Sequence, residues 1–94
     1  MKVRLTLRAS DQLLSAYDYL QTANEAAAVS RMTSIFEAID LLERYPMAGR
    51  QGRLPGTREM VVPRTPFIVA YTIADNEVQI LAVLHTSQRW PASL

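Results

Sequence analysis

Polar and apolar residues alternate strictly at the start of the chain. The apolar positions are Val3, Leu5 and Leu7, and each residue between them is polar. A period of two is typical of a strand with one face in a core and the other in solvent. We therefore expect the chain to begin with a half-buried strand.

The spacing then changes to that of a helix. Ser10 is a candidate N-cap, with Asp11 in the first turn. Apolar residues follow at positions i, i+3, i+4 and i+7, namely Leu13, Ala16, Tyr17 and Leu20. This pattern predicts an amphipathic helix.

A second and longer helix is predicted directly after the first. Asn24 offers an N-cap with Glu25 behind it, and Pro46 forbids continuation at the other end. Between them apolar residues recur at steps of four and three, at Ala28, Met32, Ile35, Ile39 and Leu42. Because so few residues separate the two helices, we expect an antiparallel hairpin whose apolar stripe covers a sheet.

The second half of the chain reads as a loop followed by strands. Residues 47–57 contain all three glycines and little apolar content, which predicts a surface loop. Strands are expected at 59–62, at 67–74 and at 77–85. We expect the link from Pro63 to Pro66 to be extended, and Asp75-Asn76 to form a two-residue hairpin turn because both residues tolerate positive φ.

These elements predict one α+β domain that spans residues 1–94. An N-terminal strand is followed by an antiparallel helical hairpin and a three-stranded antiparallel meander. With 94 residues, 49% of them hydrophobic, the chain has the balance of a globular protein. A domain this small buries only about 60–65% of its unfolded surface, so we expect a small stability margin that a partner would increase.

Composition narrows the possible chemistry. There is no cysteine and only one histidine, so we expect neither a disulfide nor a metal site, and no cofactor is indicated. The N-terminus lacks the apolar core of a signal peptide and no run approaches a membrane span, so we expect a cytoplasmic protein without membrane contact. Net charge is only +1, but residues 48–94 carry five arginines against three acidic residues. Scattered solvated arginines are the simplest interpretation of that mild asymmetry.

Four strings of residues, in order and on the expected elements, resemble the RelE/ParE superfamily. They are YPMAGR at 45–50, LPGTREM at 54–60, FIVAY at 67–71 and ILAVLHTSQRWP at 80–91. Each string alone is a weak signal, whereas together they cover nearly the whole chain. The resemblance implies the RelE/ParE-like fold and a toxin of a type II toxin–antitoxin pair, neutralised by a cognate antitoxin. It also implies growth arrest, a role in plasmid stabilisation, and contact with operator DNA only through the antitoxin.

The resemblance leaves the target open, because one fold hosts different functions. Members similar to RelE cleave mRNA in the ribosomal A site, and those similar to ParE are reported as inhibitors of DNA gyrase. Our leading hypothesis is a ParE-like toxin that binds a protein target, gyrase by analogy. The alternatives are a RelE-like, ribosome-dependent and metal-independent endoribonuclease, and an inactive member that retains only antitoxin binding.

A nuclease needs a base, an acid and cations around the reacting phosphate. The candidates are Arg58, His85 and Arg89, and Trp90 could stack on a base. RelE-like nucleases are richer in lysine and carry a C-terminal tyrosine, whereas this chain has only Lys2 and no tyrosine beyond Tyr71. These departures and the low net charge favour the ParE-like hypothesis, since RNA binding draws on phosphate neutralisation.

Structural roles compete with each functional assignment. His85 fits a hydrogen-bonded histidine at the edge of the core, and Arg58 could pair with Glu59 or bind loop carbonyls. Trp90 and Pro91 could pin the chain end over the helices. With these alternatives in view, we predict a toxic surface at Arg50, Arg53, Arg58, Arg64, Arg89 and Trp90. We predict that an antitoxin helix binds the first helix at Leu13, Tyr17 and Leu20.

Overall fold

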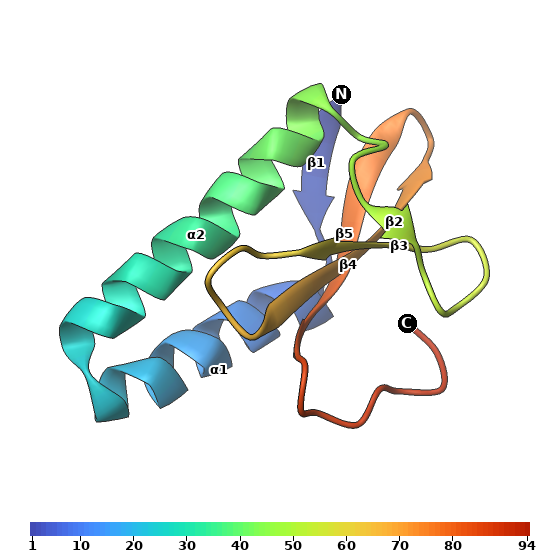
Figure 1. Ribbon diagram of the computed structural model, residues 1–94. Helices are drawn as coiled ribbons and strands as arrows, with labels where there is room; N and C mark the ends of the chain where they lie inside the picture. Colours follow the sequence, from blue (N-terminus) through green and yellow to red (C-terminus); the bar gives the residue numbers. More distant parts are fainter.

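The computed structural model describes residues 1–94, the side chain of residue 23 excepted. Two helices and five strands make up the fold (Figure 1). In chain order they are β1 (Lys2–Leu5), α1 (Leu7–Ala23), α2 (Glu25–Arg44), β2 (Arg50–Gln51), β3 (Arg58–Val61), β4 (Phe67–Ala74) and β5 (Glu77–His85).

The strands form one five-stranded sheet in the order β1-β5-β4-β3-β2. β1 runs parallel to β5, and the other neighbours are antiparallel. The predicted α+β class is confirmed, with its N-terminal strand, its helical hairpin and the meander of β3, β4 and β5. The expected turn is confirmed too, because Asp75 and Asn76 have φ of 53° and 59°.

The helical hairpin covers one face of the sheet, as Figure 1 shows. Asn24 caps α2 as predicted, since its side chain accepts a hydrogen bond from the Ala27 N–H. The predicted stripe of α2 is buried throughout, and Ala38 joins it. It packs against sheet residues that include Val69, Tyr71 and Ile80, all with no exposed surface. One continuous apolar core therefore lies between the hairpin and the sheet.

The predicted boundary between β1 and α1 is wrong by several residues. Thr6, and not Ser10, is the N-cap, and its hydroxyl accepts a hydrogen bond from the Ala9 N–H. The strand ends at Leu5, and Leu7 is 78% exposed instead of lining the core. Thr6 can serve both elements because its own N–H donates to Ile80 while its side chain begins the helix.

Two expectations for the second half also need correction. The link between β3 and β4 is a turn and not an extended segment, with Arg64 at φ 63° and the Thr65 N–H donating to the Val62 carbonyl. The loop at 47–57 contains the short strand β2, which pairs with β3. A two-residue edge strand has too few side chains to show a period, so only its pairing partner reveals it.

Candidate functional site

The face of the sheet away from the helices, which we call the open face, is covered by the C-terminal tail. Ala70, Ala82 and Leu84 form a small buried cluster there, and Trp90 and Leu94 pack against it. The tail lies on the opposite side of the sheet from the hairpin (Figure 1). The expectation that Trp90 and Pro91 cap the helices is therefore wrong. Alternate residues of β4 and β5 face opposite sides of the sheet, so these three side chains face the tail and not the helices.

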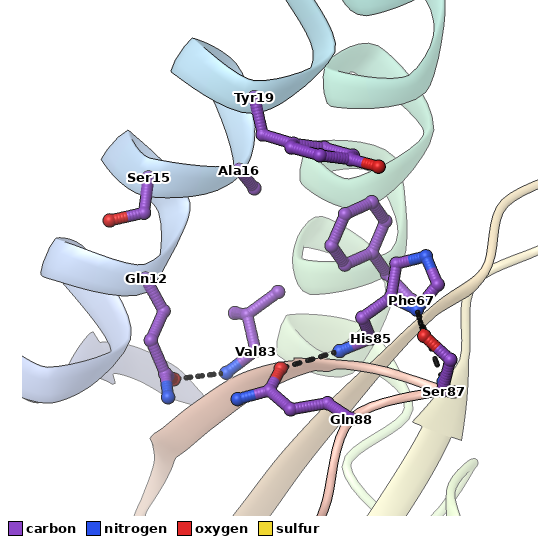
Figure 2. A pocket seen from close by; sticks show the side chains of 9 residues that line it. All are labelled: Gln12, Ser15, Ala16, Tyr19, Phe67, Val83, His85, Ser87 and Gln88. Carbon is purple, nitrogen blue, oxygen red and sulfur yellow. Dashed lines mark hydrogen bonds between the residues drawn. The ribbon is translucent and has the colours of Figure 1, made fainter.

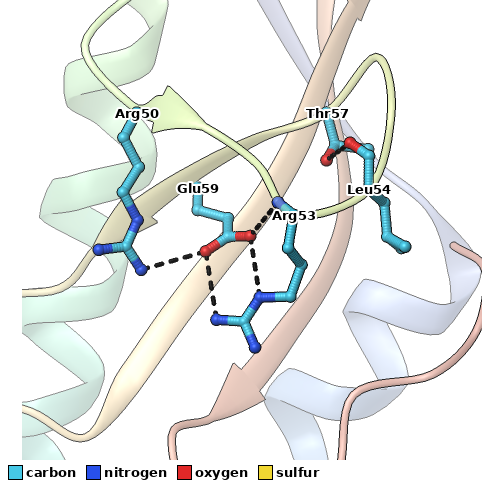
Figure 3. Close-up of polar contacts among 5 residues, drawn as sticks. All are labelled: Arg50, Arg53, Leu54, Thr57 and Glu59. Carbon is cyan, nitrogen blue, oxygen red and sulfur yellow. Dashed lines mark hydrogen bonds and ion pairs between the residues drawn. The ribbon is translucent and has the colours of Figure 1, made fainter.

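A buried carboxylate organises the arginines of the open face. Glu59 on β3 is only 3% exposed. Its carboxylate accepts hydrogen bonds from Arg50 Nη2 at 3.1 Å and from Arg53 Nε and Nη2 at 3.2 Å and 3.4 Å. The Arg53 backbone N–H donates to the same carboxylate at 2.8 Å (Figure 3). Glu59 thus ties two arginines of the loop at 47–57 to β3. We call Glu59, Arg50 and Arg53 the arginine clamp.

The clamp keeps Glu59 ionised. Burial by itself would raise the pKa of this carboxyl. Hydrogen bonds from the Arg53 backbone and from the Arg53 and Arg50 side chains, together with the Arg53 charge, outweigh burial and hold the Glu59 pKa below its usual value. The charges of Arg50 and Arg53 are accordingly compensated in part within the chain.

Arg53 also connects the clamp to the tail. Its guanidinium carbon lies 3.7 Å from the centre of the Trp90 ring, which is a cation–π contact. Of the predicted toxic surface, the structure thus brings together Arg50, Arg53 and Trp90. The residue that joins them, Glu59, was not among the predicted site residues. Glu59 could have been recognised in the sequence as the one acidic residue among these arginines. Its position in the strand directs its side chain to the open face.

Arg58 points to the other face of β3 and binds loop carbonyls. Its Nη1 donates to the Gly49 carbonyl at 2.8 Å and to the Met47 carbonyl at 3.5 Å. The alternative in which Arg58 pairs with Glu59 is wrong, since the ion-pair partners of Glu59 are Arg50 and Arg53. The alternative in which Arg58 holds loop carbonyls is confirmed.

Tyr71 holds the same loop through two hydrogen bonds of its hydroxyl. Its hydroxyl donates to the Pro46 carbonyl and accepts from the Gly49 N–H, both at 2.8 Å. Burial raises the Tyr71 pKa, partly offset by the Gly49 hydrogen bond and the Arg58 charge. Gly49 must be glycine here, because an added Cβ would lie 2.6 Å from the Tyr71 hydroxyl. The string YPMAGR therefore encodes a tightly held loop that orients Arg50.

His85 lies far from Arg58. Arg58 pairs with Tyr71 across β3 and β4, while His85 pairs with Phe67 across β4 and β5. A rise of about 3.3 Å per residue and a spacing of about 4.8 Å between strands separate the two backbones by about 16 Å. His85 packs edge-on against the Phe67 ring. Its Nδ1 accepts a hydrogen bond from the Ser87 N–H and lies 2.7 Å from the Ser87 hydroxyl oxygen (Figure 2). This is the expected histidine at the edge of the core.

The two remaining arginines, Arg64 and Arg89, form no ion pair with Glu59 of the clamp. Arg64 is exposed in the turn between β3 and β4 and lines a hollow beside α2 with Glu37 and Leu41. Arg89 is exposed on the tail, and its side chain makes no hydrogen bond or ion pair with the described residues. The three candidate catalytic residues are therefore not brought together.

The predicted antitoxin-binding residues lie on α1 beside an apolar groove. Leu13 and Leu20 are 7% and 4% exposed and belong to the core, while Tyr17 is half-buried. A hollow of about 600 Å³ runs between the outer sides of α1 and α2. Its most accessible apolar lining is Leu14, Val29 and Phe36, at 67%, 53% and 48% exposed. Sequence reasoning missed these three, although each is an apolar residue outside the core stripe of its helix.

Across residues 1–94, leaving aside the side chain of residue 23, no three histidine or acidic side chains cluster as metal ligands would. Neither α1 nor α2 is long and apolar enough to cross a bilayer.

With the fold and the site in view, comparison with known proteins defines the class. Residues 3–90 match the family of ParE toxins of the type II toxin–antitoxin system parDE. The chain is 39% identical to a putative toxin, Y4kP, of Sinorhizobium fredii over 93 residues, which cover 99% of this chain and 96% of that protein. It is 30% identical to the toxin RelE2 of Caulobacter vibrioides over 83 residues, 88% of this chain and 92% of that one.

A solved structure agrees with these relatives. The chromosomal ParDE system of P. aeruginosa contains a chain that superposes with a TM-score of 0.80 at 27% identity, covering 90% of this chain and 95% of that one. This chain belongs to the ParE toxin family, within the RelE/ParE superfamily. It is the toxin of a type II toxin–antitoxin pair, and its family implies a cognate antitoxin as partner.

Proposed function

We propose that this toxin arrests growth as ParE-like members do, by binding a protein target, with DNA gyrase the target by analogy. In this proposal the chain performs no chemistry of its own. It acts in the cytoplasm, where gyrase works, and reaches operator DNA only through its antitoxin.

The separation of the candidate catalytic residues carries the proposal. A base, an acid and a cation must surround one phosphate within hydrogen-bond reach. Arg58 is engaged with loop carbonyls and lies about 16 Å along the sheet from His85. The clamp further compensates Arg50 and Arg53, which weakens the field available to attract RNA.

A direct assay distinguishes the two targets. We expect the purified toxin to inhibit supercoiling by purified gyrase and to leave mRNA intact in a purified translation system. Codon-specific cleavage of ribosome-bound mRNA without an effect on gyrase would contradict the proposal and favour the endoribonuclease. No effect in either assay, with antitoxin binding intact, would favour an inactive member.

The arginine clamp is the surface that we assign to target binding. Arg53→Ala removes a guanidinium that is held in place by an ion pair with Glu59 and by the Trp90 ring. We therefore expect growth arrest to be relieved. Arg31, exposed on α2, provides the matched control Arg31→Ala, which should remain toxic. Circular dichroism checks that both variants fold. Equal toxicity of the two variants would move the target surface away from the clamp.

The apolar groove between α1 and α2 is the proposed seat of an antitoxin helix. Burying an exposed leucine contributes about 1.5–3 kcal/mol, so Leu14→Ala should weaken antitoxin binding at least about tenfold. Leu7→Ala removes another exposed leucine of α1, which lies outside the groove, and this variant should bind normally. Calorimetry measures both affinities. Equal affinities would place the antitoxin elsewhere on the toxin.

A further inference from the structure

The arginine clamp leaves hydrogen-bond donors unused. An arginine side chain carries its N–H donors on three nitrogens, and Glu59 takes only Nη2 of Arg50 and Nε and Nη2 of Arg53. Within the described part of the chain, Arg50 Nε, Arg50 Nη1 and Arg53 Nη1 make no hydrogen bond. The two arginine side chains are 57% and 47% exposed, so these donors are accessible to a partner.

The two guanidinium groups converge on one oxygen. Arg50 Nη2 and Arg53 Nη2 lie 3.1 Å and 3.4 Å from the same atom, Glu59 Oε1. Figure 3 shows the two arginines reaching this carboxylate from different parts of the loop at 47–57. Two cations around one buried anion leave one positive charge over. A second anion that contacts both guanidinium groups from the solvent side would complete the charge balance.

Arg53 is held in position before any partner arrives. Its backbone N–H and its side chain both donate to Glu59, and the Trp90 ring lies against its guanidinium group at 3.7 Å. A long side chain that is already ordered loses little conformational entropy when it binds. The clamp is therefore a preorganised site and not a pair of freely moving arginines.

The surroundings of the clamp favour a protein ligand over a nucleic acid. A hollow of about 250 Å³ lies between the loop at 47–57 and the tail, and it begins at Leu54, the residue after Arg53. Most of its lining is apolar, namely Leu54, Pro55, Leu81, Ala92 and Leu94. A nucleic acid repeats its charge at every phosphate and draws its affinity from several cations. One excess positive charge beside apolar side chains suits a carboxylate within a peptide segment.

We propose that the arginine clamp binds a side-chain carboxylate from an acidic segment of the target protein, through the free N–H groups of Arg50 and Arg53. The inference rests on the proposed function and names the chemistry that the target presents to this site. The planar fork of a guanidinium group matches a carboxylate in geometry and charge. Glu59 stays in place on the inner side of both arginines, so the partner carboxylate adds to the clamp without displacing it.

The first test uses the purified whole toxin and a blocked hexapeptide that contains two glutamates. Trp90 is the only tryptophan of the chain and contacts Arg53, so its fluorescence reports on the clamp. We expect a saturable change in fluorescence, and an affinity at least about tenfold lower for the same peptide with glutamine in place of glutamate. Equal affinities for the two peptides, or no binding of either, would overturn the inference.

A conservative variant tests whether the fork matters beyond its charge. Arg50→Lys keeps the positive charge but loses the planar group, so the acidic peptide should bind about fivefold more weakly. Arg31→Lys, on the exposed side of α2, is the matched control and should bind as the wild type does. Circular dichroism checks the fold of both variants. An unchanged affinity of Arg50→Lys would contradict the role assigned to this side chain.

A trinucleotide with two phosphodiester groups matches the charge of the acidic peptide and tests the class of ligand. We expect it to bind more weakly than the peptide, and tighter binding would assign the clamp to nucleic acid and overturn the inference. These titrations contain no gyrase, so they separate the inference from the proposed function. Inhibition of gyrase by a toxin that does not bind the acidic peptide would overturn the inference alone. Peptide binding by a toxin without effect on gyrase would support the inference and contradict gyrase as the target.

Discussion

The two faces of the sheet are stabilised by different means. Toward the helices, buried side chains such as Ile35, Leu42 and Ile80 make one dry core. On the open face the buried apolar cluster consists of Ala70, Ala82 and Leu84, and a short tail packs against it. The ion pairs of Glu59 with Arg50 and Arg53 hold the loop at 47–57 on that face. The comparison teaches that the helix face stabilises the fold, whereas the open face uses few, polar and accessible contacts, as a surface for partners requires.

The difference follows from side-chain alternation in β3. Met60 packs toward the helix-side core, while its neighbour Glu59 turns to the open face. A carboxylate in that position needs cations, because an unpaired buried charge would cost several kcal/mol. The loop at 47–57 provides them in Arg50 and Arg53. The charged residues of the clamp thus lie on the face of the sheet opposite the core that stabilises the protein.

The largest effect is expected on the helix face. Ile35→Ala opens a cavity at a residue with no exposed surface and should cost about 2–5 kcal/mol in the free energy of unfolding. Denaturant unfolding measures the loss. The neighbouring Phe36→Ala, at 48% exposed, should cost clearly less. Similar losses for the two variants would contradict the assignment of the core to this face.

A smaller effect is expected where the core meets the loop. Tyr71→Phe deletes the hydroxyl that binds Pro46 and leaves the buried Gly49 N–H without its acceptor, at a cost of about 1–3 kcal/mol. Tyr45→Phe changes an exposed tyrosine nearby and should leave the free energy of unfolding nearly unchanged. If both variants unfold at the wild-type denaturant concentration, the hydroxyl does not secure the loop.

The arginine clamp should respond to pH as well as to mutation. Glu59→Gln weakens the hydrogen bonds from Arg50 and Arg53, and because both arginines are about half exposed we expect a loss of about 1–2 kcal/mol at neutral pH. The folded-state pKa of Glu59 lies below the ordinary value of 4.5 for a glutamate side chain. Its contribution is therefore fully present above about pH 4.5 and is lost as pH falls through the lower, folded-state pKa.

Thermal unfolding as a function of pH follows this contribution. Wild-type stability should decline more steeply below about pH 4.5 than that of Glu59→Gln, because the variant has no proton to take up at this position. Parallel curves for the two proteins would show that the clamp does not lower the Glu59 pKa in solution.

The smallest effect is expected at the tail. Trp90→Ala removes the contact with Arg53 and part of the cover over Ala70, Ala82 and Leu84, and it should change the free energy of unfolding by about 1 kcal/mol or less. Limited proteolysis should nevertheless cut the variant faster after residue 85. A loss as large as that of Ile35→Ala would show that the open face is a second core, which would remove the contrast between the faces.

Much of the architecture followed from periodicity alone. The buried stripe of α2, the bounds of β4 and β5 and the turn at Asp75-Asn76 match the sequence expectations. Long elements with one buried face repeat their signal several times, and positive φ restricts the residues that a turn accepts. The predicted start of α1 was several residues too late. Leu7 continues the alternation of apolar and polar residues, although β1 ends at Leu5 and α1 already begins at Leu7.

The sequence by itself determined the order of the long elements, the core stripe and the family, because each depends on residues that are near neighbours or stand in fixed strings. Only the tertiary structure decided which charges meet. Glu59 could have paired with any nearby arginine. The register of β2 on β3 places Arg50 opposite it, and the loop after β2 brings Arg53 to the same carboxylate. The bond from Val83 to Gln12 joins residues 71 positions apart. Such contacts depend on strand register and helix placement, which no local pattern encodes.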